Sequence, residues 1–187
     1  MKTFNYKGLV ILLSALAFIS IVTALPFIQS DYSSTEQLMS ELALGGYGFL
    51  MLFAFLAFAI AVFTAQQILA TYDNNLALRT LLIIASCSLA GAGVFELGDY
   101  DALHIGLVAL AFVLIVLAMY LVPRLIPVFQ APTPTIVCWS LGVATAIFVA
   151  LGQDFIPMGI AQRLAAGCLF IWLLWLAAFH QKQMASH

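Results

Sequence analysis

The chain has 187 residues, of which 65% are hydrophobic and only 7% are charged, and its formal net charge is −2. Soluble domains carry about 25% charged residues, so this composition excludes a soluble fold and makes lipid the main solvent. The small net charge, without a basic cluster or a glycine-rich phosphate loop, excludes a nucleic-acid partner. In hydrocarbon only helices or closed barrels satisfy the backbone, and these apolar runs are too long and unalternating for barrel strands. We therefore predict an all-α, polytopic membrane bundle.

Six apolar runs are long enough to cross a bilayer, since about 20 residues rising 1.5 Å each span roughly 30 Å of hydrocarbon. The first run follows Lys2 and Lys7 and resembles a secretory signal, but it is long for one and Pro26 follows closely. We therefore expect a retained helix. The predicted transmembrane helices are 8–28, 47 to about 70, 78–95, 103–122, 135–151 and 160–179, in a single domain over 1–187.

The charged residues divide between the two faces that six spans create. Short loops rich in lysine and arginine stay in the cytoplasm, so we predict that both the N and C termini are cytoplasmic and that the other face is acidic. A chain with one span more or one span fewer would place basic and acidic residues together on the same face. The cytoplasmic set is Lys2, Lys7, Arg79, Arg124 and Lys182; the outer set is Asp31, Glu36, Glu41, Glu96, Asp99, Asp101, Asp154 and a single base, Arg163.

Local patterns add three structural predictions. Capping-box spacings, Ser33 to Glu36 and Ser34 to Gln37, predict a short interfacial helix over 33–44. Small residues in the third span favour close packing against a neighbouring helix. The cysteines have no metal or haem spacing and are interpreted as small core residues. The residues concerned are Ser86, Ser88, Gly91 and Gly93, and Cys87, Cys138 and Cys168.

The densest polar constellation is the outer turn between the third and fourth spans. Glu96, Asp99 and Asp101 precede His104 there, and such a set suggests a divalent-cation site or an acid–base pair. The structural alternative is that Asp99 or Asp101 caps the fourth helix. His104 lies about one turn into that helix and is expected to face the bundle, as a structural histidine or as a ligand.

Arg163, about one turn into the last span, is the only base on the acidic side. We expect it to point inward and to bond a carboxylate or a backbone carbonyl near the outer rim, with Asp154 or the acids of the third-to-fourth turn as ion-pair partners. The alternative partner is an anionic lipid or substrate group. No facing histidine pair indicates haem and no zinc spacing is present, so the sequence assigns no cofactor.

Three stretches resemble a family of bacterial six-helix membrane proteins, domain of unknown function 998. They are SELALGGYGFLM at 40–51, the acidic turn followed by His104, and GIAQR at 159–163. The family commonly has Phe-Pro before the hairpin aspartate, where this chain has Phe95-Glu96. The resemblance implies a multi-pass protein of the bacterial inner (plasma) membrane and selects Asp99, His104 and Arg163. It carries no established chemistry.

These observations leave three functional hypotheses. The first is a bundle that binds a lipid or small molecule or serves as an accessory subunit, with membrane lipids, another protein or a second copy as partners. The second is a metal-dependent membrane hydrolase, and the third is a small transporter, although charges at the span ends are unlike the midplane groups of transporters. The candidate ligand-binding set is Glu96, Asp99, Asp101, His104, Asp154 and Arg163.

Overall fold

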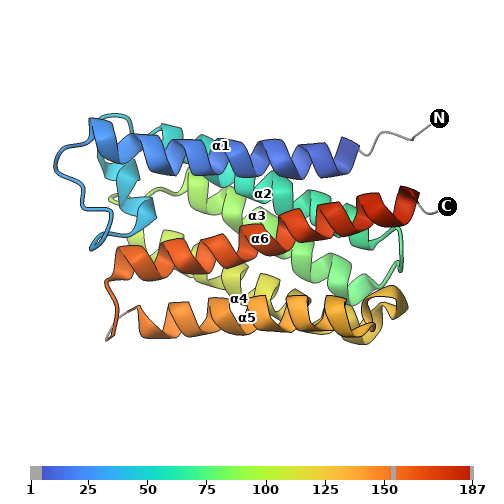
Figure 1. The fold of residues 1–187 in the computed structure, drawn as a ribbon. Helices are drawn as coiled ribbons and strands as arrows, with labels where there is room; N and C mark the ends of the chain where they lie inside the picture. Colours follow the sequence, from blue (N-terminus) through green and yellow to red (C-terminus); the bar gives the residue numbers. More distant parts are fainter. Residues whose placement is uncertain (1–5, 153–154, 186–187) are drawn as a thin grey trace.

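A computed structural model describes residues 6–152 and 155–185, and every regular element in that part of the chain is a helix. Six long helices form a bundle whose two chain ends lie at the same end (Figure 1). Each is long and apolar enough to cross a membrane, which confirms the predicted fold class and span number. The elements are α1 (Tyr6–Ile28), η1 (Met39–Leu44), α2 (Leu50–Leu69), α3 (Leu76–Val94), α4 (Asp101–Leu125), η2 (Pro127–Phe129), α5 (Pro132–Leu151) and α6 (Met158–Ala185), where η denotes a 3₁₀ helix.

The helices extend beyond the apolar runs where polar residues or prolines continue them. The last run was predicted to end at Phe179, but α6 continues to Ala185, because Gln181, Lys182 and Gln183 are good helix formers outside the apolar window. Similarly, α5 begins at Pro132, since proline is tolerated in a first helical turn, where its missing N–H would have no partner.

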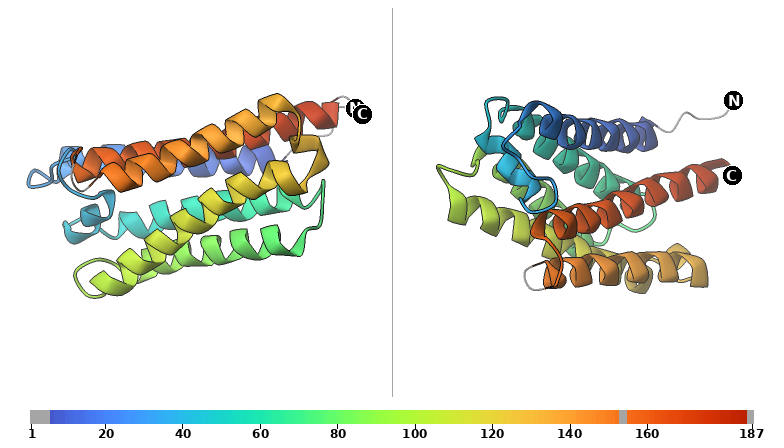
Figure 2. Two further views of the ribbon diagram at one scale, coloured as in Figure 1. Left: turned by 90° about the horizontal axis from the view of Figure 1, so that it is seen from below. Right: turned by 60° about the vertical axis from the view of Figure 1, so that its left-hand side comes forward.

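Consecutive helices are neighbours, and α6 returns to pack against α1 and α2. In the view from below, α4 crosses obliquely between α3 and α5 (Figure 2). The closure of α6 on α1 and α2 is centred on three phenylalanines. The Phe58 and Phe170 rings stack with centroids 4.5 Å apart, and the Phe18 ring is 4.8 Å from Phe170. Such aromatic pairs contribute about 0.5–1.5 kcal/mol beyond their buried area.

The small residues of α3 allow the close approach to α2 that the sequence predicts. The Ser86 hydroxyl donates to the Ala59 carbonyl at 2.9 Å, and a Cβ on Gly93 would lie 2.9 Å from the Phe55 Cβ. The cysteine prediction is partly wrong. Cys138 is buried, whereas Cys87 is exposed, because it lies on the α3 face turned away from the bundle.

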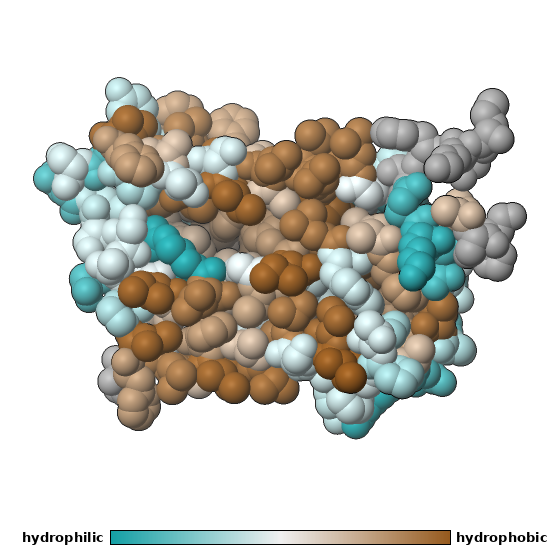
Figure 3. All heavy atoms as spheres, viewed as in Figure 1, coloured by the Kyte–Doolittle hydropathy of each residue, from teal (hydrophilic) through white to brown (hydrophobic). Residues whose placement is uncertain are grey.

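The surface divides as a membrane protein's should. Hydrophobic atoms cover the middle of the bundle, and hydrophilic atoms gather at its two ends (Figure 3). We call the end that holds both termini the terminal end, and the end that holds the α1–α2, α3–α4 and α5–α6 connections the distal end. The helix order brings Lys7, Arg79, Arg124 and Lys182 to the terminal end, as the charge sorting requires.

We expect the terminal end to face the cytoplasm. In a chain without its native cysteines, single cysteines at the exposed positions Asp31 and Asp99 should react with a membrane-impermeant maleimide in intact cells. A cysteine at the exposed Lys182 should react only after the cells are permeabilised. Labelling at 31 and 99 from opposite sides would contradict the six-span topology.

Candidate functional site

The start of α6 holds the α1–α2 connection at the distal end. A Cβ on Gly159 would lie within 2.7 Å of the backbone oxygens of Ser34 and Thr35, so only glycine permits this approach. The Gln162 amide oxygen accepts the Met39 N–H at 2.6 Å, and the Ile160 N–H donates to the Thr35 carbonyl at 3.3 Å. The GIAQR stretch is therefore a structural latch for the α1–α2 connection.

The predicted interfacial helix over 33–44 is wrong for its first half. Only Met39–Leu44 is helical, as the 3₁₀ helix η1, and the box that opens it pairs the Leu38 N–H with the Glu41 carboxylate at 2.9 Å. The Ser33 hydroxyl does accept from the Glu36 N–H at 3.4 Å, but this closes a turn. The cause is tertiary, because the Ser34 and Thr35 carbonyls and the Met39 N–H, which an α-helix would pair internally, are bonded to α6.

Arg163 points inward at the distal rim, as predicted. Its Nη1 donates to the Ser34 carbonyl at 2.6 Å and to the Gly159 carbonyl at 3.1 Å, and its Nη2 donates to the Tyr32 hydroxyl at 2.8 Å. Backbone carbonyls are thus its partners, and no described carboxylate is among them. The predicted partner Asp154 lies outside the described residues.

Replacing Arg163 should measurably destabilise the bundle. Hydrogen bonds to charged groups contribute about 1.5–3 kcal/mol, and solvent near the rim reduces this, so Arg163→Ala should lower the free energy of unfolding by roughly 2 kcal/mol. Arg163→Lys should recover only part, because an ammonium lacks the planar fork that reaches two partners at once. Detergent-solubilised protein can be unfolded thermally to check this; an alanine variant as stable as the wild type would contradict the latch.

His104 faces the bundle and is only 1% exposed. Its Nδ1 lies 2.8 Å from the Ala92 carbonyl and 2.9 Å from the Phe95 carbonyl, two acceptors at the C-terminal end of α3 that the helix leaves free. The ring also meets Phe55 edge to face at 5.3 Å. His104 therefore links α4 to the C-terminal end of α3 and packs this hairpin against α2.

The second ring nitrogen of His104 is the unusual feature. Carbonyl oxygens only accept, so Nδ1 must carry the proton. Nε2 is buried and has no hydrogen-bond partner among the described residues. A buried polar atom without a partner costs about 1–3 kcal/mol, and each such atom in a native protein calls for an explanation, of which an unseen bound group is one.

The carboxylates predicted to converge with His104 do not do so. Glu96, Asp99 and Asp101 are exposed, while the imidazole is buried against α2 and α3. Among the described residues no group of three or more His, Cys, Asp and Glu side chains could hold a metal ion. The arrangement on which the hydrolase hypothesis depended is therefore not formed by these four residues.

The capping prediction is also wrong. The N-cap of α4 is Tyr100, whose side chain makes no capping bond, and Asp101 is the first helical residue. Instead, the Asp101 carboxylate accepts the N–H of Gly98 at 2.7 Å. Gly98 has a φ of +100°, a conformation that suits glycine. Asp101 thus closes the turn before the helix, while its charge remains favourably placed in the positive first turn.

An apolar groove of about 870 Å³ runs beside His104 between α4 and α5. Along α4 its wall extends from His104 to Tyr120, a length of about 24 Å at 1.5 Å per residue. The wall is aliphatic or aromatic for most of that length, and polar side chains from three elements gather at its distal end. These are Ser40 of η1, His104 of α4 and Gln162 of α6.

Sequence reasoning missed this groove, which we call the α4–α5 groove. Small residues on both helices, Ala109, Ala146 and Ala150, leave the space, but alanine is common in every transmembrane helix and gives no specific signal. The only available signal was His104 itself, a titratable residue inside an apolar run. The volume of the α4–α5 groove falls within the range of roughly 300–1,000 Å³ that ligand pockets occupy.

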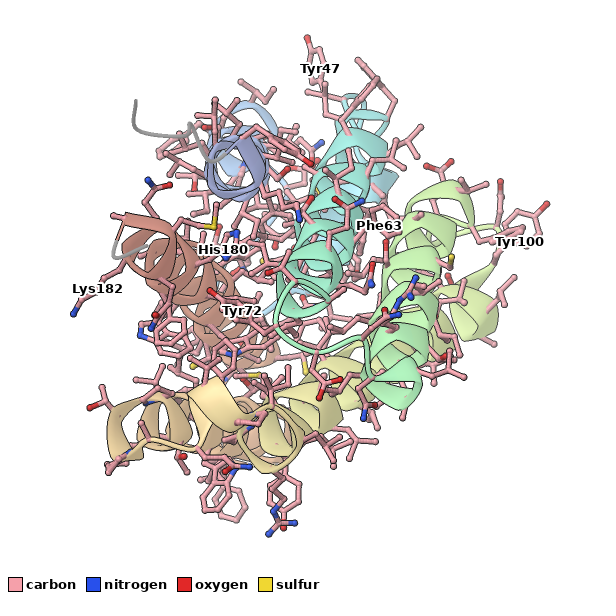
Figure 4. The ribbon with its side chains drawn as sticks, turned by 90° about the vertical axis from the view of Figure 1, so that its right-hand side faces the viewer. Tyr47, Phe63, Tyr72, Tyr100, His180 and Lys182 are labelled. Atoms are coloured by element: carbon pink, nitrogen blue, oxygen red, sulfur yellow. The ribbon has the colours of Figure 1, made fainter. Side chains whose placement is uncertain are left out.

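The terminal end holds a second polar contact that the sequence did not indicate. Tyr72, between α2 and α3, and His180 of α6 point toward each other (Figure 4), with the hydroxyl 2.9 Å from Nδ1. Burial raises the pKa of Tyr72 to about 12, so the hydroxyl stays protonated. Nearby, the Lys7 ammonium donates to the Gln67 carbonyl at 3.1 Å. These bonds close the terminal end of the bundle.

Comparison with known proteins agrees with this architecture. Neither a curated protein nor a solved structure matches the chain. One family model, described as "Protein of unknown function (DUF998)", matches residues 12–178 and so spans all six helices. The chain belongs to this family of proteins of unknown function.

Proposed function

We propose that this protein binds a lipid in the α4–α5 groove, with the lipid's head at His104 and its chain along α4 and α5. The observation that carries the proposal is the buried, unpartnered Nε2 of His104 at the polar end of an otherwise apolar groove. A lipid-binding role explains both features together, whereas a purely structural histidine explains only the two carbonyl bonds of Nδ1.

The chemistry of the groove narrows the class of lipid. In a neutral imidazole with a proton on Nδ1, Nε2 is an acceptor, so its partner must donate a hydrogen bond. Ser40 and Gln162 add a hydroxyl and an amide at the same end. These groups suit an uncharged head that bears a hydroxyl. The roughly 24 Å apolar wall suits a single long acyl or isoprenoid chain.

The site also requires a small movement. His104 is 1% exposed, so a head group reaches Nε2 only when neighbouring side chains shift. Ser40 and Gln162 lie on two elements joined by the Met39–Gln162 bond, and a slight displacement of η1 from α6 would open this end. Entry of the lipid into the α4–α5 groove would therefore be slower than the exchange of lipids at the outer surface of the bundle.

The distribution of basic residues supports a location in a bacterial plasma membrane with the His104 end outward. Such a protein would take a lipid from the outer leaflet and hold it, for delivery or as a ligand that reports on the membrane. The groove supplies a reason to prefer lipid binding to the accessory-subunit hypothesis, because its apolar wall and its unpartnered polar atom together match a lipid.

Quantitative mass spectrometry of the purified protein tests the proposal. After purification in a mild detergent and extraction with organic solvent, about one lipid with an uncharged, hydroxyl-bearing head should be recovered per chain, far above its share of the host membrane. An extract that merely matches the membrane's lipid composition would contradict the proposal. Lipid from an unrelated six-helix protein, purified in parallel, provides the baseline.

A further inference from the structure

A second groove, of about 660 Å³, lies between α1 and α6 and shares no lining residue with the α4–α5 groove. Its distal end is polar, with Tyr32, Ser34 and Arg163. The rest is apolar and runs between helix faces that include Val22 of α1 and Ile171 of α6. The surface view shows this arrangement as a hydrophilic patch at the loop end of a hollow flanked by hydrophobic atoms (Figure 3). We call it the α1–α6 groove.

Arg163 brings a positive charge to this groove that its own hydrogen bonds do not balance. Within residues 6–152 and 155–185, the groups that accept from it are two backbone carbonyls and a phenol, all neutral. Tyr32 stays a neutral phenol, because burial raises its pKa by more than the neighbouring guanidinium lowers it. The Glu41 carboxylate contributes a negative charge that acts on Tyr32. The carboxylate oxygens of Glu41 are engaged by the Leu38 N–H and the Gln37 amide.

The fixed geometry of the guanidinium matters as much as its charge. Tyr32, Ser34 and Gly159 hold it at the rim of the groove, one turn into α6. Because a charge at this depth is costly unless it is paired, an anion that enters the groove gains a preorganised partner. Guanidinium groups favour phosphate, whose oxygens match their donors.

We propose that the α1–α6 groove binds an anionic phospholipid, whose phosphate contacts Arg163 and whose acyl chain lies along the apolar faces of α1 and α6. Free phosphate would leave the apolar part of the groove empty, so the lipid is the ligand that fits both halves. This site is independent of the lipid proposed at His104, whose head is uncharged and whose groove is separate.

Gly167 supplies a second way to test the site. It lines the groove one turn beyond Arg163, and a Cβ built on it meets no atom within 4 Å. Gly167→Leu therefore places a side chain in the space for the acyl chain and leaves the charge of the guanidinium in place. Arg163→Gln removes the charge but keeps a polar, uncharged side chain at the rim of the groove.

The test is native mass spectrometry of delipidated protein titrated with phosphatidylglycerol or phosphatidylcholine of the same chains. The wild type should bind phosphatidylglycerol about tenfold more tightly than phosphatidylcholine, in line with one charged hydrogen-bonded contact. Arg163→Gln should lose this preference, and Gly167→Leu should weaken binding of both lipids. Inorganic phosphate should fail to compete at concentrations where phosphatidylglycerol binds.

Three results would overturn the proposal. These are equal affinities of the wild type for the two lipids, a full preference retained by Arg163→Gln, and competition by inorganic phosphate as effective as by the lipid. If Arg163→Gln does not fold, Gly167→Leu decides, because unchanged phosphatidylglycerol binding by that variant would exclude the groove. The His104 variants leave this result unaffected, so the two lipid sites succeed or fail separately.

Discussion

His104→Asn is expected to lose the lipid bound in the α4–α5 groove while the protein stays folded. The asparagine amide nitrogen takes roughly the place of Nδ1, so it can still donate to the Ala92 and Phe95 carbonyls. Nothing in asparagine replaces Nε2. Losing one buried hydrogen bond costs about 1–3 kcal/mol, and we therefore expect lipid occupancy at limiting concentration to fall about tenfold.

Two matched variants separate this effect from general damage. His104→Gln places an amide near Nε2 but withdraws the donor at Nδ1, so it should weaken the α3–α4 hairpin more than it weakens lipid binding. Thr145→Val removes a hydroxyl from the groove wall that is already bonded to the Leu141 carbonyl at 2.8 Å. Its lipid occupancy should not change. A folded His104→Asn protein with wild-type occupancy would show that Nε2 does not contact the ligand.

Gly159→Ala is expected to cause a large loss of stability at the distal end. The new Cβ would lie 2.6 Å from the Ser34 oxygen and 2.7 Å from the Thr35 oxygen, and closer still to the Gln37 oxygen. Three backbone atoms must move, which breaks the bonds that Ile160 and Arg163 make to this segment. Overpacking costs about 1–3 kcal/mol, and the lost bonds bring the expected destabilisation to about 3 kcal/mol.

Gly167→Ala is the control on the same helix. Its Cβ meets open space, so it should be neutral or stabilise by up to about 1 kcal/mol, the difference in helix propensity. Thermal unfolding of both variants in one detergent gives the comparison. Equal melting temperatures for Gly159→Ala and Gly167→Ala would mean that α6 does not press against the α1–α2 connection.

The helices were predictable because each depends on a local property of the chain. A run of about 20 apolar residues must form a helix in lipid, and the positions of Arg79, Arg124 and Lys182 fixed how many runs there are. The close α2–α3 contact followed from Ser86 and Gly93 for the same reason, since small side chains permit approach whatever the partner is.

The distal end was predictable only in part, because its partners are distant in sequence. The inward direction of Arg163 followed from the cost of a charge in lipid, but its bonds to Ser34 and Tyr32 reach back about 130 positions, and no local pattern encodes them. The segment 33–44 carries a genuine capping signal at Ser33. That signal yields a turn because α6 competes for the same backbone groups.

The acidic turn shows the opposite failure, in which proximity along the chain suggested a site that the fold does not form. Asp101 and His104 are three residues apart, yet the carboxylate bonds Gly98 and the imidazole enters the bundle. The two side chains lie one turn apart on nearly the same side of α4. Asp101 is at the exposed start of the helix, whereas His104 is deep enough to pack against Ala92 and Phe55. The groove beside His104 depends on the arrangement of η1, α4, α5 and α6, which no single segment specifies.

Site-specific photocrosslinking tests the central claim, that a particular lipid occupies the α4–α5 groove. A benzophenone side chain at Val113, which lines the groove and is 63% exposed, is compared with one at Ile60, which is 50% exposed on α2 and lines neither groove. After irradiation in native membranes, intact mass should show one dominant lipid adduct at 113 and the mixed phospholipids of the bilayer at 60. The same mixture at both positions would contradict the claim.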